Sequence, residues 1–137
     1  MRKIFSILSK CINYFIEVIK GKDHPTEITR FGTKLWRNKF HQFHRDNDLP
    51  AWVYKSGDQY WWQNDKCHRD GDKPAMITNQ DDYTWFKNGK CHRDNNLPAV
   101  IYTRLRHCQW WIDGKCIREG QYTLKEINEW KKPYGGK

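Results

Sequence analysis

Three tripeptides in the chain combine histidine and aspartate, which can act in general acid–base catalysis, with arginine, which can bind an anion. They are His44-Arg45-Asp46, His68-Arg69-Asp70 and His92-Arg93-Asp94, and each lies 24 residues from the next. A weaker fourth copy, Ile117-Arg118-Glu119, follows after 25 residues. Self-similarity at a fixed period of this size is typical of stacked supersecondary units. A residue that recurs in every copy is therefore first a structural element of the repeat.

The sequence offers little support for catalysis by these residues. His-Arg-Asp also occurs in the catalytic loop of protein kinases, but a kinase has it once and adds a Gly-rich loop and Asp-Phe-Gly, which this sequence lacks. No Ser-His-Asp arrangement stands out either. We therefore predict that the chain is not an enzyme. We expect the recurring Arg and Asp to tie each connecting loop to its neighbour through charge-assisted hydrogen bonds.

A metal site is the other chemistry to consider, since a cysteine precedes two of the histidines. The candidate ligands are Cys67-His68, Cys91-His92 and Cys116. Adjacent residues of a strand point to opposite faces, and equivalent residues of successive copies lie two or three strands apart, which is ~10–14 Å. Zinc needs ligand atoms about 2.0–2.3 Å from one ion. We predict neither a metal nor another cofactor, and we interpret the recurring cysteines as small core residues.

Alignment of the copies shows how much of each one recurs. Seven residues before each tripeptide stands a tryptophan followed by another aromatic residue: Trp61-Trp62, Trp85-Phe86 and Trp110-Trp111. A polar pair comes next: Asn64-Asp65, Asn88-Gly89 and Asp113-Gly114. Six residues after each histidine comes Pro-Ala: Pro50-Ala51, Pro74-Ala75 and Pro98-Ala99. The first copy is degenerate, because Trp36 lies eight residues before His44.

These recurring pieces predict short antiparallel strands. Asn-Gly and Asp-Gly tolerate positive φ at both central positions of a type I′ turn, so the residues on either side are the arms of a hairpin. Proline suits the first residue of a strand, and 98–102 reads as a further strand. The predicted fold is mainly β, an antiparallel hairpin-repeat meander or solenoid of about 3.5 copies with two or three strands in each copy.

The arginines and the tryptophans would each form a row along such a stack. Rows that both faced solvent could grip phosphates and stack bases. The alternative is that the first tryptophan row (Trp61, Trp85 and Trp110) is the core. Adjacent residues of a strand face opposite sides, so one member of each aromatic pair lies on the less buried face. That row is the candidate protein-binding stripe, because large aromatic residues anchor interfaces.

Composition and charge limit the classes of function. The 137 residues form one domain, with only 37% hydrophobic residues but 15% aromatic ones, which suits a thin repeat structure. Residues 1–40 carry nine Lys/Arg against three Asp/Glu, residues 41–94 eight against nine, and residues 95–137 eight against four. The basic ends could meet an acidic partner or a phosphate surface. Five cysteines, three of them at one repeat position, favour a reducing compartment over paired disulfides.

Residues 1–22 are predicted to form an N-terminal amphipathic helix. Its apolar arc is wide and includes the residues assigned to assembly: Ile4, Phe5, Leu8, Ile12, Phe15 and Ile19. The helix is too short, and too interrupted by Lys10 and Glu17, to span a bilayer. It also lacks the small-residue cleavage site of a secretory signal. Three alternatives stay open: a cap on the first repeat, an element buried in a partner or another copy, and a helix lying in a membrane surface.

Residues 123–137 are predicted to form a C-terminal capping helix and tail. Thr123 and Glu126 make a capping box. Leu124, Ile127 and Trp130 supply a narrow apolar edge, and Pro133 ends the helix. This helix would close the stack.

The repeat unit resembles a known family. The run Trp-aromatic-x-Asn-Gly-Lys-x-His-Arg-Asp-x-x-Leu-Pro-Ala, seen from Trp85 to Ala99, is similar to the MORN-like hairpin repeats of large DNA viruses, some phages and bacteria. The resemblance covers residues 33–122, with His-Arg-Asp where the usual consensus has His-Gly-x-Gly. It implies β-hairpins stacked into an elongated sheet, used for protein contacts, dimerisation or binding of acidic lipids, and it implies no catalysis.

The sequence thus favours a non-enzymatic repeat scaffold that mediates protein–protein interaction or assembly, in one setting as a minor virion or capsid-associated structural protein. Its partners would be other proteins, bound through the N-terminal helix and an aromatic face, and it would take no small-molecule substrate. The competing hypothesis is a basic, phosphate-directed module that binds nucleic acid or anionic membrane through its ends. Either protein would be cytoplasmic or in a virion, neither secreted nor membrane-spanning.

Overall fold

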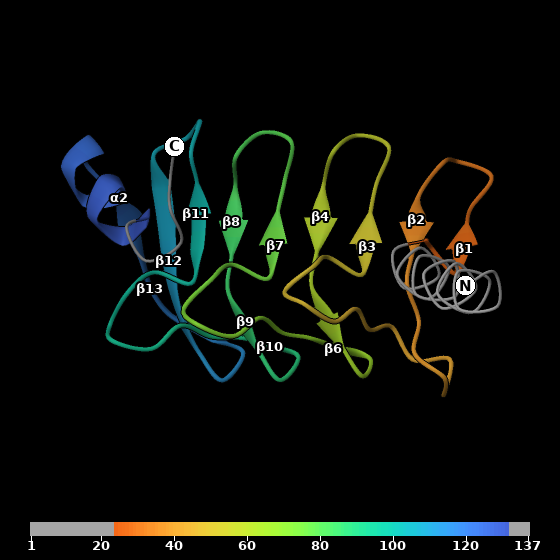
Figure 1. Cartoon of the computed structure of the whole chain (residues 1–137). Coiled ribbons are helices and arrows are strands. Elements are labelled where there is room, and N and C mark those ends of the chain that lie inside the picture. Colours follow the sequence, from red (N-terminus) through yellow and green to blue (C-terminus); the bar gives the residue numbers. More distant parts are fainter. Residues whose placement is uncertain (1–23, 132–137) are drawn as a thin grey trace, which may run out of the picture.

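The computed structural model describes residues 24–131 and shows a mainly β protein built from antiparallel hairpins, as predicted. Its largest sheet has nine strands. In spatial order they are β1 (Glu27–Ile28), β2 (Lys34–Leu35), β3 (Trp52–Val53), β4 (Gln59–Tyr60), β7 (Met76–Ile77), β8 (Tyr83–Thr84), β11 (Val100–Tyr102), β12 (His107–Ile112) and β13 (Lys115–Gln121). Figure 1 shows these hairpins side by side in a row from β1 to β13. The predicted N-terminal helix lies outside the described residues.

Two smaller hairpins lie below the large sheet in Figure 1. One pairs β5 (Trp62–Gln63) with β6 (Lys66–Cys67), and the other pairs β9 (Phe86–Lys87) with β10 (Lys90–Cys91). The turn residues have φ values of 50° at Asn64, 61° at Asp65, 51° at Asn88 and 83° at Gly89. Positive φ at both central positions is what a type I′ turn requires, so the predicted hairpin arms and their turn are confirmed.

The two middle copies contain more strands than predicted, because the chain bends at a buried tryptophan in each. Trp61 stands between β4 and β5, and its two backbone groups serve different sheets. Its N–H donates to the carbonyl of Ala75 at 2.8 Å, and its own carbonyl accepts from the N–H of His68 at 3.1 Å. Trp85 repeats this pattern with Ala99 and His92. One predicted arm is thereby split into two strands of two residues each.

The last copy keeps its two long strands unbroken but contains a β-bulge. Across β12 and β13, Trp110 lies opposite Arg118 and Trp111 lies opposite Cys116. Ile117 is therefore the extra residue on β13. This bulge does not lengthen the copy: Trp85 and Trp110 are already 25 residues apart, whereas Ala75 and Ala99 are 24 apart, so the extra residue lies between Ala99 and Trp110.

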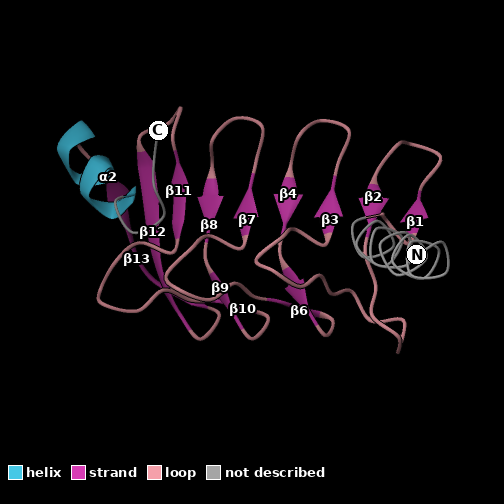
Figure 2. Cartoon of the chain, in the orientation of Figure 1, coloured by secondary structure: helices cyan, strands magenta, loops and turns pink. Residues whose placement is uncertain are grey.

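The helix α2 (Leu124–Lys131) packs on one face of the sheet at its C-terminal end, as Figure 2 shows in cyan. The predicted capping box is present: the Glu126 carboxylate accepts from the Thr123 N–H at 2.7 Å. Ile127 is buried in a cluster with Trp85, Ala99, Ile101, Cys108 and Tyr122. Leu124 is 62% exposed, so its predicted place on the apolar edge is wrong; the helix docks through its later turns. Within residues 24–131, no helix is long and apolar enough to cross a membrane.

Candidate functional site

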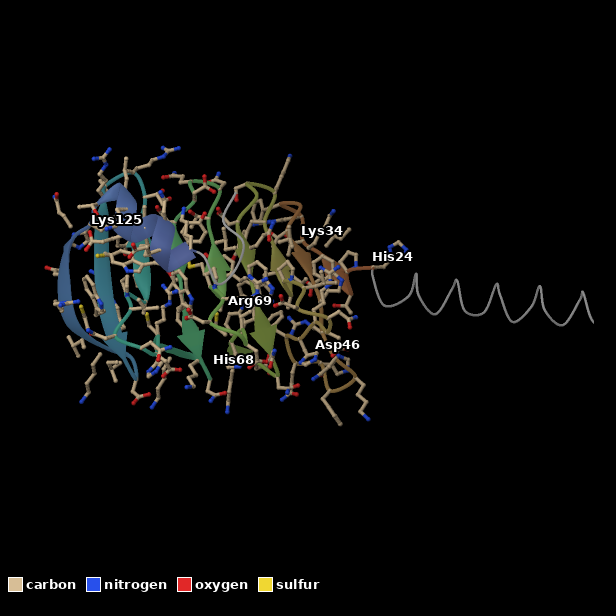
Figure 3. All side chains as sticks on the ribbon, turned by 60° about the vertical axis from the view of Figure 1, so that its left-hand side comes forward. His24, Lys34, Asp46, His68, Arg69 and Lys125 are labelled. Atoms are coloured by element: carbon tan, nitrogen blue, oxygen red, sulfur yellow. The ribbon has the colours of Figure 1, made fainter. Side chains whose placement is uncertain are left out.

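One face of the sheet carries an arginine stacked on a tryptophan in every copy, and we call it the arginine face. The guanidinium carbon lies 3.7–3.8 Å from the ring centroid in four pairs: Arg45 on Trp36, Arg69 on Trp61, Arg93 on Trp85 and Arg118 on Trp110. Trp36, Trp61 and Trp85 are buried, and Trp110 is half-buried. The first tryptophan row is therefore core, covered by the arginine row. Figure 3 shows Arg69 over the middle of the sheet, with His68 below it.

Each interior arginine also binds the carboxylate of the preceding loop. Arg69 Nε and Nη2 donate to the two oxygens of Asp48 at 2.7 and 3.1 Å. Arg93 binds Asp72 in the same bidentate way at 2.8 and 2.9 Å. Donation by Arg69 is the main reason that the pKa of Asp48 is held below its ordinary value. The tie between loops was predicted, but it comes from Asp48 and Asp72, two residues after each tripeptide.

Arg93 is the most enclosed of these arginines. Its side chain is 0% exposed, and its Nη1 and Nη2 donate to the carbonyls of Pro98 and Trp130 at 3.3 and 2.9 Å. The second of these bonds joins α2 to the sheet. A buried guanidinium is stable only when its donors are satisfied, and these bonds satisfy them.

The histidines of the tripeptides are held between two fixed partners. Nε2 of His44, His68 and His92 lies 3.1, 3.0 and 2.8 Å from the carboxylate of the aspartate two residues later. Nδ1 of each accepts a backbone N–H from the turn of the next copy, donated by Asn64, Asn88 and Asp113 at 3.3, 3.1 and 3.1 Å. A backbone N–H can only donate, so the ring proton is on Nε2. Asp46, Asp70 and Asp94 thus bond within their own copy.

The buried tryptophans complete the contacts between copies. The indole N–H of Trp61, Trp85 and Trp110 donates to the carbonyl of Asp48, Asp72 and Asn96, each at 3.0 Å. His, Arg and Trp therefore all join one copy to the next. Within the described part of the chain, no three His, Cys, Asp or Glu residues gather as a metal site would require. The tripeptides are committed to structure, so the candidate site has to be sought elsewhere.

The opposite face carries a cluster of five aromatic rings, which we call the Trp52 cluster: Phe43, Trp52, Tyr54, Tyr60 and Trp62. The Trp52 and Trp62 rings stack with centroids 5.1 Å apart and planes inclined by 30°. Phe43 meets Trp52 edge-on at 4.8 Å, and Tyr60 lies 6.2 Å from Trp52 and 5.5 Å from Tyr54. All five side chains are half-buried. The one described helix, α2, packs on the arginine face.

Two features mark this cluster. The indole nitrogens of Trp52 and Trp62 are buried, with no hydrogen-bond acceptor among residues 24–131, a feature that Trp36 on the arginine face shares. A buried unpaired donor costs about 1–3 kcal/mol, so the cluster is poorly optimised for stability. Four of its five positions also do not recur as aromatics in the second copy, where Cys67, Met76, Thr78 and Thr84 replace Phe43, Trp52, Tyr54 and Tyr60.

The remaining residues of the second aromatic row are divided. Trp62 and Phe86 both pack against the buried cluster of Trp61, Cys67 and Ala75, and Trp62 also stacks on Trp52. Trp111 lies beside the C-terminal core. Sequence reasoning missed the other four members of the cluster because it looked for residues that recur. The useful signal was the reverse, an aromatic residue whose equivalent in the next copy is not aromatic.

The cysteines of the repeat become more exposed toward the C-terminal end. Cys67 is buried, Cys91 is half-buried and Cys116 is exposed. Burial raises the pKa of Cys67 and of Cys91 to about 12. These two thiols therefore stay protonated and act as core side chains.

No protein-family model, no curated protein and no solved structure matches this chain.

Proposed function

We propose that this protein is a non-enzymatic MORN-like hairpin-repeat scaffold that binds another protein through the Trp52 cluster. The recurring contacts of the arginine face support the first half of the proposal, because equivalent His, Arg and Trp residues join copy to copy as in a solenoid. The resemblance in sequence suggests a setting, that of a minor virion or capsid-associated component in a reducing compartment.

The observation that carries the binding half is a half-buried surface cluster that is rich in Trp and Tyr. These residues are enriched at the centres of protein interfaces, since they bury a large area with few rotatable bonds. Here four of them and Phe43 form one cluster on a face that α2 does not cover. Arg37 adds a cation, with its guanidinium 3.7 Å from the centroid of Phe43, 3.9 Å from the Glu27 carboxylate and donating to the carbonyl of His41. An apolar surface rimmed by a guanidinium fits a protein surface with an acidic border.

The competing function, binding of nucleic acid or anionic membrane, has less support in the described residues. A phosphate-binding face would present free cations, whereas Arg69 and Arg93 are stacked on tryptophans and paired with aspartates. The cations of residues 1–23 and 132–137 lie outside the described part. The expected result is no binding to duplex DNA or anionic vesicles at physiological salt. A steep fall of affinity with salt concentration would favour the competing function.

The binding half is tested by quantitative pull-down with the whole chain and two single variants. Trp52→Ser removes the centre of the cluster, and Trp111→Ser is the control, since it alters a half-buried tryptophan on the same face in another copy. We expect Trp52→Ser to lose the partners that the wild type and Trp111→Ser both retain. Identical partners for all three proteins would contradict the proposal. Thermal unfolding of each variant checks that the fold is intact.

A further inference from the structure

The last arginine of the arginine face differs from the interior ones in what it can bind. Arg118 lies 3.7 Å from the centroid of Trp110, as its equivalents lie on theirs. Arg69 and Arg93 each hold a carboxylate in addition. Arg118 is exposed and has no hydrogen-bond acceptor for its guanidinium among residues 24–131. Its donors therefore face solvent above an aromatic ring.

The missing carboxylate has a local cause in the sequence. Asn96 occupies the place that Asp48 and Asp72 occupy in the earlier copies. Its φ is 54°, against 56° and 51° at the two aspartates, and its carbonyl accepts the Trp110 indole N–H as theirs accept from Trp61 and Trp85. The loop backbone is thus the same, and the carboxylate alone is absent.

A second acceptor is missing for a different reason. Arg69 and Arg93 each donate Nη1 to a proline carbonyl in their own following loop, Pro74 and Pro98. After Arg118 the chain continues along β13 and has no such loop. The carboxylate of the next residue, Glu119, is otherwise engaged, since it accepts from Gln109 at 3.3 Å.

We propose that Arg118 and Trp110 form a binding site for the carboxylate side chain of a partner protein. The bound carboxylate takes two parallel hydrogen bonds from the guanidinium, as Asp48 and Asp72 do inside the molecule. Trp130 of α2, whose ring centroid lies 6.1 Å from that of Trp110, borders the site. This inference stands independently of the proposed function, because the site is on the arginine face and the Trp52 cluster is on the other.

The chain supplies a matched pair of peptide probes. Asn-Asp-Leu-Pro-Ala copies residues 47–51, and Asn-Asn-Leu-Pro-Ala copies residues 95–99. Each is acetylated and amidated, and is titrated into the full-length protein while NMR follows the Trp110 indole N–H and the Arg118 Nε–H. We expect saturable shifts of both signals with the aspartate peptide and none with the asparagine peptide. Equal shifts with the two peptides overturn the proposal. Inorganic phosphate is a third probe, and shifts from phosphate without shifts from the aspartate peptide overturn it in favour of a phosphate site.

Two variants test the site from opposite directions. Arg118→Gln removes the guanidinium, and the shift of the Trp110 signal on addition of the aspartate peptide is expected to disappear. Asn96→Asp supplies the missing carboxylate from within, so we expect at least tenfold weaker binding of the peptide and a higher urea midpoint than in the wild type. Peptide binding that survives Arg118→Gln, or that is unchanged in Asn96→Asp, overturns the proposal. Both variants change exposed side chains, so their folds are expected to persist; amide spectra verify this.

Discussion

Trp61 and Trp62 are neighbours in the chain, yet the two faces of the sheet use them differently. On the arginine face, Trp61 lies under Arg69 and donates its indole N–H to the carbonyl of Asp48. On the other face, Trp62 stacks on Trp52 and its indole N–H is buried without an acceptor. A tryptophan with a bonded indole N–H recurs at Trp85 and Trp110, whereas four of the five positions of the Trp52 cluster are not aromatic in the next copy. Recurrence therefore identifies residues that build the fold, and departure from it identifies residues available for binding.

The largest expected effect compares one tryptophan from each face. Trp85→Ala removes a ring that is 3% exposed and leaves a cavity under Arg93, which is expected to cost about 4 kcal/mol of unfolding free energy. Trp62→Ala removes a half-buried ring whose N–H is unpaired, and is expected to cost about half as much. Urea unfolding followed by circular dichroism measures both. Equal losses would remove the distinction between the faces.

The next comparison is between the interior and the end of the arginine face. Arg93→Met leaves Asp72 without its guanidinium and breaks the bond to Trp130, and we expect a loss of about 3 kcal/mol. Arg118→Met removes an exposed arginine with only a ring contact, and is expected to cost about 1 kcal/mol or less. Chemical denaturation gives both values. If Arg118→Met lowered the unfolding free energy as much as Arg93→Met, the guanidinium of Arg118 would be as fully bonded as that of Arg93.

A smaller effect is expected from acidification. The pKa of Asp48 is lowered in the folded state, so its contribution is present above about pH 4, the unfolded value, and is lost as the pH falls through the lower folded value. The Asp48 side chain is 41% exposed, which limits this contribution to about 1 kcal/mol. Wild type and Asp48→Asn should therefore differ in urea midpoint at pH 7 and converge as the pH falls below the folded pKa of Asp48. A constant difference across this range would exclude the ion pair as its source.

The last prediction changes no stability and concerns the cysteines. In a Cys11→Ser background, an alkylating reagent at pH 8 should modify Cys116 within minutes and leave Cys67 and Cys91 largely unmodified, because burial raises the pKa of those two thiols to about 12. Mass spectrometry of the digested protein reads the pattern. Rapid modification of Cys67 in the native protein would show that this part of the core opens readily.

Much of the fold was predictable because it depends on local backbone rules. Asn88-Gly89 specifies its turn, and Thr123 with Glu126 specifies the start of α2. The split at Trp61 was not predictable, since it arises from the long-range pairing of its N–H with Ala75. The role of Asp48 was missed for a related reason: its partner Arg69 is 21 residues away, and only the register of the copies brings them together.

The candidate site was harder to predict than the fold. The pattern showed that Trp61 and Trp62 face opposite sides, but it did not show which side the loops and α2 cover. Which face of the sheet is covered depends on the path of the loop formed by residues 46–50. Local propensities do not determine that path. Phe43 and Tyr60 join the cluster only through neighbouring strands, which again requires the register.

The bonds of the interior arginines and of their tryptophan indoles all run back to the preceding copy, and this determines how the length of the protein can change. Each interior copy offers a carboxylate and a carbonyl to the copy after it, and receives a guanidinium and an indole N–H in return. Both boundaries of an interior copy are therefore chemically alike. Inserting or deleting a whole 24-residue unit would leave every junction of the same type and would move the two ends apart or together by about 10 Å, the width of two strands. The number of copies thus determines the distance between a partner bound at one end of the stack and a partner bound at the other.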